Sequence, residues 1–97
     1  MEENTKQVAE LLKILANENR LMILCVLMEQ PLTVNKIADK IPNITQPALS
    51  QHLSLFKACG ILDYVKSGQN VTYSIADHRV VEVIHTIKKY YCADSYH

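Results

Sequence analysis

The chain has 97 residues, 48% of them hydrophobic, with two Gly, three Pro and a formal net charge of zero. This composition excludes a disordered or loop-rich protein, and no apolar run approaches the ~18 residues that a membrane span requires. We expect residues 1–97 to form a single domain, small enough that oligomerisation is a natural way to gain core. The N-terminus is acidic and then amphipathic, the wrong order for a secretory signal, so we expect a cytoplasmic location and no membrane partner.

The charged residues are unevenly distributed along the chain. Residues 1–32 carry three basic and five acidic side chains, whereas residues 33–75 carry four basic and two acidic ones. The middle of the chain is therefore its basic part. The bias is small, and it permits nucleic-acid binding without demonstrating it.

The first thirty residues are predicted to form two helices. Apolar residues recur at helical spacing between residues 4 and 16, which indicates the first helix. Asn17 is a suitable N-cap for the second helix, whose apolar residues follow the same spacing. Pro31 ends this second helix, because the residue before a proline disfavours the helical conformation.

Residues 33–59 are predicted to form two further helices joined by a tight turn. Thr33 can cap a short helix that runs through Lys40. Thr45 can cap the next helix, which Cys59-Gly60 ends because Gly is the usual residue just past a helix end. Two short helices in this arrangement are typical of a helix-turn-helix.

The period of the apolar pattern changes to two over residues 61–76. Two runs rich in β-branched and aromatic residues, 61–66 and 70–75, flank a segment with turn chemistry. They predict a β-hairpin, the wing of a winged helix-turn-helix. A last helix is predicted over 78–92. The expected fold class is α+β and mainly helical, with four helices, a hairpin and a final helix.

The last predicted helix is too apolar for a single buried stripe. Its apolar residues cover more than one face of residues 78–92. A helix of this kind in a small protein packs against its own domain and against a partner. Since the helix at 4–16 is the other candidate for that seam, the sequence predicts a homodimer formed through these two helices.

The helix after the turn is expected to enter the major groove of double-stranded DNA, with its small and polar residues at the base edges. These residues are Gln46, Ala48, Ser50, Gln51 and His52, with Lys57 on the same polar face. Phosphate contacts are expected from Lys36, Lys40, Lys66 and Gln69. His52 can contact a base, contact a phosphate or pack partly at the surface, and we rank the phosphate first. The alternative for any one of these residues is a solvated helix face.

Four stretches between residues 11 and 77 stand out: LLKILANENRLMILCVL, LTVNKIADKI, QPALSQHLSLFKACGIL and VTYSIAD. Together they resemble the ArsR/SmtB family of bacterial repressors, and the pattern from Gln46 to Leu55, with Gly60 soon after, is specific. The resemblance implies a homodimer that binds an imperfect inverted repeat near its own operon and is released by an inducer. It aligns the candidate base-reading residues with the family's DNA-reading helix.

The metal sites of that family are not matched by this chain. Thr33 and Asn35 stand where a thiolate pair is needed, and neither supplies a soft ligand. Asp77 matches the first ligand of the zinc site on the last helix, but the others fall on Arg79, Tyr90 and Ala93. We therefore expect no metal at these sites and no cofactor. A different site remains open to four residues: His78, His85, Asp94 and His97.

The cysteines provide a further resemblance. Cys25 and Cys92 match in position the two thiols of the BigR-, SqrR- and HlyU-like branch of the family, which senses sulfide and redox state. The resemblance implies that these thiols form a disulfide or polysulfide bridge that weakens DNA binding. The alternative is that Cys25 is a small core residue and Cys92 a surface residue. Cys59 has no counterpart in that pair, and we expect it to pack at a helix end.

The sequence thus predicts a transcriptional repressor whose operator affinity is switched by oxidation or persulfidation of Cys25 and Cys92. Two alternatives stay open: a metal-responsive repressor with an unconventional site, and a winged-helix protein-interaction module that has lost DNA binding. An enzyme is not expected, because no nucleophile–base constellation, phosphate loop or carboxylate pair stands out.

Overall fold

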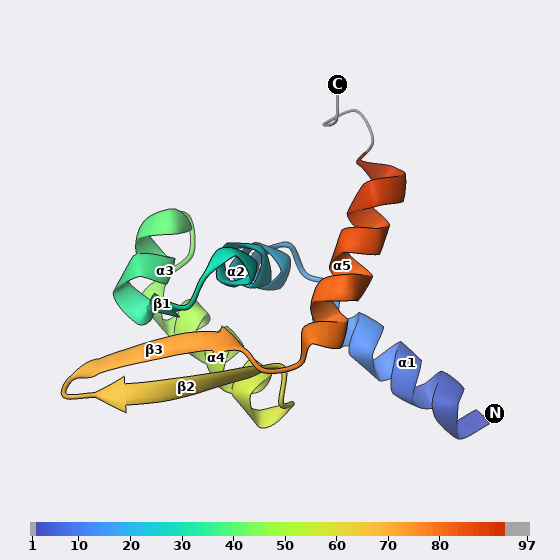
Figure 1. Ribbon diagram of the computed structural model, residues 1–97, viewed down its shortest axis with the longest axis horizontal. Coiled ribbons are helices and arrows are strands. Elements are labelled where there is room, and N and C mark those ends of the chain that lie inside the picture. Colours follow the sequence, from blue (N-terminus) through green and yellow to red (C-terminus); the bar gives the residue numbers. More distant parts are fainter. Residues whose placement is uncertain (1, 93–97) are drawn as a thin grey trace.

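The computed structural model describes residues 2–92, with side chains from residue 4 onward (Figure 1). Its helices and strands follow one another in this order: α1 (Glu2–Leu15), α2 (Glu18–Glu29), β1 (Leu32–Thr33), α3 (Val34–Lys40), α4 (Gln46–Ala58), β2 (Leu62–Ser67), β3 (Asn70–Ile75) and α5 (His78–Tyr91). Ala93, which stands at one of the family's zinc positions, and the possible metal ligands Asp94 and His97 lie outside the described residues.

The mainly helical α+β class and the winged helix-turn-helix arrangement are confirmed. Three N-caps expected from the sequence begin their helices as predicted. Asn17 accepts a hydrogen bond from the Arg20 N–H (3.1 Å). Thr33 and Thr45 accept from the N–H groups three residues on, each at 3.3 Å. These side-chain oxygens satisfy backbone donors that a helix start leaves without partners.

The sheet has one strand more than the predicted hairpin. Its order is β1-β3-β2, and all pairs are antiparallel, with Leu32 opposite Tyr73. The expectation of two strands was wrong because β1 has only two residues, too few to show a period-two pattern, and its partner lies far along the chain. The hairpin itself turns at Gly68, whose φ of 61° suits a residue without a side chain.

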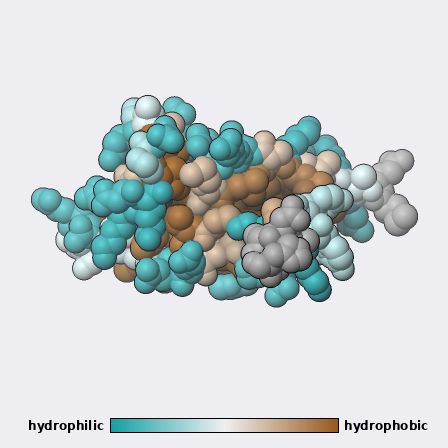
Figure 2. Space-filling model, turned by 90° about the horizontal axis from the view of Figure 1, so that it is seen from above, coloured by the Kyte–Doolittle hydropathy of each residue, from teal (hydrophilic) through white to brown (hydrophobic). Residues whose placement is uncertain are grey.

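The first and last helices project from the rest of the molecule in different directions (Figure 1). Apolar side chains stay exposed on both: Val8 and Leu12 on α1, and Ile87, Tyr90 and Tyr91 on α5. Seen from above, apolar residues gather in a band over the region of α2 and α5, with hydrophilic residues at its margins (Figure 2). None of the helices in the described part of the chain is both long and apolar enough to cross a bilayer.

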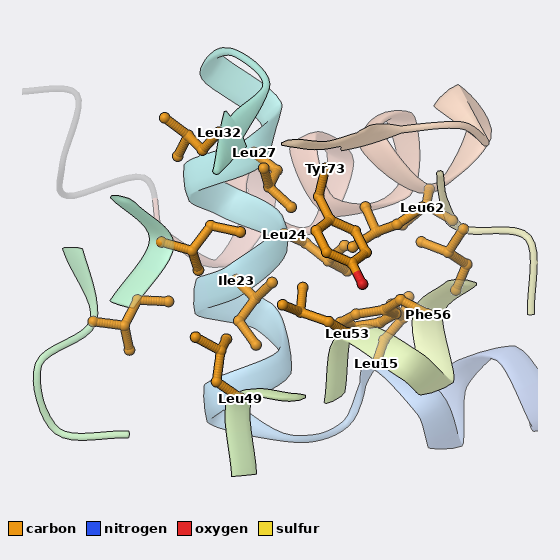
Figure 3. Packing of buried hydrophobic residues seen from close by; sticks show 14 of the residues in the cluster. Leu15, Ile23, Leu24, Leu27, Leu32, Leu49, Leu53, Phe56, Leu62 and Tyr73 are labelled. Atoms are coloured by element: carbon orange, nitrogen blue, oxygen red, sulfur yellow. The ribbon is translucent and has the colours of Figure 1, made fainter. Parts of the chain in front are cut away.

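The hydrophobic core is built around α2. Ile23 and Leu24 of this helix are fully buried and face side chains from α4 and β3 (Figure 3). From α4, Leu49, Leu53 and Phe56 supply the buried stripe. Because three positions at helical spacing are buried, α4 is fixed against α2 and its opposite face is left for contacts with a partner.

Candidate DNA interface and thiol pocket

The exposed face of α4 carries most of the residues predicted to read DNA bases. Gln46, Ser50 and Gln51 are exposed, whereas Ala48 and His52 are half-buried. Pro47 lies in the first turn, where its missing N–H costs no hydrogen bond. The arrangement presents short polar side chains at the N-terminal half of a helix that follows a tight turn.

The predicted phosphate contacts lie on both sides of α4. Lys36 and Lys40 are exposed on α3 and line one shallow cavity of about 320 Å³. Lys66 and Gln69 are exposed on the hairpin formed by β2 and β3. Positive charge is therefore available on α3 and on the wing, flanking the helix that would enter the groove.

Lys57 links the end of α4 to the wing. Its Nζ lies 3.3 Å from Asp63 Oδ1 and 5.6 Å from the centre of the Tyr64 ring. The pKa of Asp63 is lowered, first by the hydrogen bond from the Tyr64 N–H and then by Lys57. Lys57 also lines a cleft of about 430 Å³ between α4 and the wing, together with Lys66. Lys57 thus connects the C-terminal end of α4 to the wing.

His52 has a partner that the sequence did not indicate. Arg20 Nε donates a hydrogen bond to His52 Nδ1 at 3.3 Å, across 32 residues of sequence. Burial lowers the pKa of His52, and the Arg20 charge lowers it further. A neutral imidazole that accepts at Nδ1 carries its proton on Nε2, so the ring remains a donor but not a cation.

Cys25 and Cys92 line the same cavity, an apolar pocket of about 420 Å³ between α1, α2 and α5. Its other lining residues come from all three helices and, with Ala16, from the junction between α1 and α2: Leu12, Leu15, Ala16, Leu21, Ile84, Ile87 and Lys88. Cys25 is half-buried, while Cys92 is exposed at the end of α5, where its N–H donates to the Lys88 carbonyl at 2.8 Å. Two cysteines that are far apart in the sequence thus line one pocket of the folded chain.

Cys59 lies apart from that pair. It is exposed at the C-terminal end of α4 and lines a different cavity, of about 430 Å³, between α1 and α5. The expectation that Cys59 packs at a helix end holds for its position, but its side chain is exposed. It therefore serves as an internal control for the pair at positions 25 and 92.

Two of the residues at the family's zinc positions, Asp77 and Arg79, bind each other. Asp77 caps α5 and accepts hydrogen bonds from Arg79, two from the guanidinium at 2.9 and 2.8 Å and one from the backbone N–H. The guanidinium bonds are the main cause of the lowered pKa of Asp77. His78 and His85 are exposed on α5. Across the described residues, no three His, Cys, Asp or Glu side chains gather where they could hold a metal ion.

A tight helix-turn-helix with polar residues along its second helix, followed by a β-hairpin, defines a winged-helix DNA-binding protein of the kind that regulates transcription. Residues 17–64 match the model of the bacterial regulatory proteins of the arsR family. The chain belongs to this family. Its relatives are transcriptional regulators and not enzymes.

Three relatives cover nearly the whole chain. The transcriptional activator HlyU of Vibrio cholerae is 36% identical over 92 residues, which are 95% of this chain and 84% of that protein. Its solved structure has a TM-score of 0.84 and covers 95% of this chain and 99% of its own. The transcriptional repressor BigR from Xylella fastidiosa has a TM-score of 0.86 at 29% identity, with 95% and 93% covered. The Mycobacterium bovis domain Mb0332, described as a homodimeric winged helix-turn-helix, has a TM-score of 0.78 at 27% identity, with 98% and 85% covered.

Proposed function

We propose that this regulator is a dimeric repressor that binds an inverted-repeat operator and loses affinity for it when Cys25 and Cys92 become covalently linked. The observation that carries the proposal is the shared pocket, which both thiols line although they come from α2 and from the end of α5. Cys25 and Cys92 face the same apolar space, whereas Cys59 lines another cavity.

The DNA-binding part of the proposal is supported by the surface of α4 and its flanks. Exposed Gln46, Ser50 and Gln51 can donate to or accept from base edges. Ala48 is small enough to approach a thymine methyl group. Lysines on α3 and on the wing supply positive charge for contacts with phosphates. Local positive charge is therefore present although the net charge of the whole chain is zero.

The dimer is supported by the apolar side chains that α1 and α5 expose. Val8 is 56% exposed, Tyr90 69% and Tyr91 85%. Exposed apolar side chains that gather into a patch mark an interaction site. The similar structure from Mycobacterium bovis is described as homodimeric, and it covers 98% of this chain at 27% identity. A twofold dimer would place two α4 helices at half-sites about one DNA turn (~34 Å) apart.

The proposed chemistry needs an oxidant that carries a transferable sulfur or oxygen. With a persulfide, one cysteine thiolate attacks the outer sulfur, forms a cysteine persulfide and releases the donor as a thiol. The second thiolate attacks the inner sulfur of that persulfide, forms the Cys25–Cys92 disulfide and expels hydrosulfide. With a hydroperoxide, the first thiolate takes up oxygen as a sulfenic acid and releases an alcohol, and the second thiolate displaces water. One solved structure of HlyU is described as the reduced protein.

The link would act on DNA binding through α5. A disulfide requires Cα atoms within roughly 7 Å, so it draws the end of α5 and the middle of α2 to a fixed separation. Since α5 carries much of the exposed apolar surface proposed as the dimer seam, this changes the angle between subunits. Small changes in the spacing and tilt of the two α4 helices cost affinity for a fixed operator.

The test uses an inverted-repeat duplex selected from random DNA by the reduced protein itself. Affinity for this duplex is measured before and after treatment with glutathione persulfide or an organic hydroperoxide, and intact-mass spectrometry of the same samples reports the link. We expect at least a tenfold loss of affinity in the wild type and in Cys59→Ser. Cys25→Ser and Cys92→Ser should keep the affinity of the reduced protein after treatment.

Two outcomes contradict the proposal. If the linked wild type binds as tightly as the reduced protein, the switch is wrong. If no duplex can be selected and no salt-dependent DNA binding is seen, the DNA-binding part is wrong and the chain is an interaction module instead.

A further inference from the structure

Arg20 forms hydrogen bonds that connect α1, α2 and α4. Its backbone N–H donates to the Asn17 side chain and so holds the start of α2. Its guanidinium donates from Nη1 to the Ile14 carbonyl of α1 at 3.2 Å and from Nε to His52 Nδ1 of α4 at 3.3 Å. Arg20 is half-buried, so these hydrogen bonds are partly shielded from competition by water.

The contact with α1 follows from the way that helix ends. α1 ends at Leu15, so the carbonyl of Ile14 is among the last four of the helix. These carbonyls accept no hydrogen bond from an N–H group of their own helix. A cation at a helix C-terminus is favourable because the carbonyls there carry partial negative charge. The same guanidinium thus caps α1 and binds α4. These contacts fix α4 relative to the junction between α1 and α2.

The contact with α4 fixes the chemical state of His52. An imidazole nitrogen that accepts a hydrogen bond from Arg20 cannot itself be protonated. The neutral ring must therefore carry its proton on Nε2. Protonating the ring would put a second cation 3.3 Å from the guanidinium, and burial of the ring opposes it as well. His52 is in this way a neutral donor with a fixed orientation.

We propose that Arg20 is a positioning residue for DNA recognition, which holds His52 as the Nε2–H tautomer so that this N–H donates to an acceptor on the operator. This rests on the proposed DNA binding through α4. The acceptor is a phosphate oxygen, or a purine N7, guanine O6 or thymine O4 at a base edge. In this role His52 donates a hydrogen bond as a neutral ring, whereas a protonated surface histidine would bind a phosphate through its positive charge.

The chain offers matched variants for the test. His52→Gln keeps an amide N–H near the position of Nε2, whereas His52→Asn keeps only a group near Nδ1. Arg20→Lys keeps the charge but cannot serve both acceptors with the same fork, and Arg20→Gln removes the charge. Arg79→Gln is the control, because Arg79 is an arginine that bonds only within the start of α5 in the contacts described above.

The measurements are affinity of each reduced, full-length variant for the selected inverted-repeat duplex and the ¹⁵N imidazole spectrum of His52 in the wild type. We expect about a tenfold loss for Arg20→Gln, Arg20→Lys and His52→Asn, the worth of one hydrogen bond, and less than a threefold loss for His52→Gln and Arg79→Gln. The spectrum should show Nε2 protonated and Nδ1 unprotonated near neutral pH.

The proposal is overturned by a wild-type spectrum with the proton on Nδ1, or by Arg20 variants that bind like Arg79→Gln. The spectrum of the wild type identifies the tautomer without any variant. The proposal can therefore still be refuted if a variant fails to fold. Wild-type protein that binds no selected duplex overturns the proposed function and this role together. Tight wild-type binding that is indifferent to Arg20 overturns this role alone.

Discussion

His52 shows how a single contact changes the meaning of a residue. In the sequence it is one of several polar residues on a helix face, and a phosphate contact by its cationic form is a reasonable first expectation. In the structure the ring is half-buried and bonded to Arg20, which lies 32 residues earlier. No local sequence pattern predicts such a pair, because side chains far apart in the sequence form hydrogen bonds only once the helices have packed.

The lowered pKa of His52 makes a prediction about stability. Burial, and then Arg20, lower the pKa of His52 below its ordinary value of 6.5 in the folded protein, so the unfolded chain binds a proton more readily. The stability contributed by the neutral ring is complete above pH 6.5 and declines as the pH falls from there towards the folded pKa. We expect the free energy of unfolding of the wild type to drop over this interval, and that of His52→Gln to drop less. Urea denaturation at a series of pH values measures both.

His85 provides the control for this experiment, since it is exposed on α5. His85→Gln should follow the wild-type pH profile. Parallel profiles for the wild type and His52→Gln would contradict the assignment of the effect to residue 52.

At the scale of elements, the sequence predicted what local rules determine. Helix spacing, three side-chain caps and the glycines at the turns placed the helices and the hairpin close to their observed bounds. β1 was missed because two residues such as Leu32-Thr33 pair with β3 only through tertiary packing. The pocket that Cys25 and Cys92 share could be expected only from the family resemblance, since nothing in their spacing brings α2 and α5 together.

The start of α5 allows a prediction at this scale. Asp77 is its N-cap, and its carboxylate also binds the Arg79 side chain. Replacing a capping Asp by Ala typically costs about 1 kcal/mol, so Asp77→Ala should lower the free energy of unfolding by about that amount. Asp77→Asn keeps a capping oxygen and should cost less. Chemical denaturation at pH 7 compares the three proteins.

The pH dependence of the cap has the same sign as that of His52, because both folded pKa values are lowered, but it falls at a lower pH. Because the folded protein lowers the pKa of Asp77 below 3.8, the capping stability is complete above that value and is lost as the pH falls through the folded pKa. The difference between wild type and Asp77→Ala should therefore shrink in acid. A difference that stays constant down to pH 2 would mean that the carboxylate charge contributes nothing.

At the scale of the whole molecule, the thiol pocket and the proposed dimer seam share two helices. α1 and α5 line the pocket and also carry five of the large exposed apolar side chains: Val8, Leu12, Ile87, Tyr90 and Tyr91. In the proposed dimer, a change inside the pocket would therefore act on the same two helices that join the subunits. The recognition helix α4 packs on α2, so it moves with the body of its own subunit.

The seam can be tested by placing carboxylates on it. Val8 on α1 and Tyr90 on α5 are 56% and 69% exposed, and neither lines the thiol pocket, so Val8→Glu with Tyr90→Glu should leave the subunit fold and the thiols intact. In a dimer these carboxylates would be desolvated, which is costly without a paired charge. We expect sedimentation velocity to show monomers, and affinity for the inverted repeat to fall roughly 100-fold or more, because each subunit then binds one half-site without the benefit of linkage. Val65→Glu on the wing, where Val65 is 70% exposed, is the matched control and should stay dimeric. A double variant that sediments as a dimer would show that the subunits meet through other surfaces.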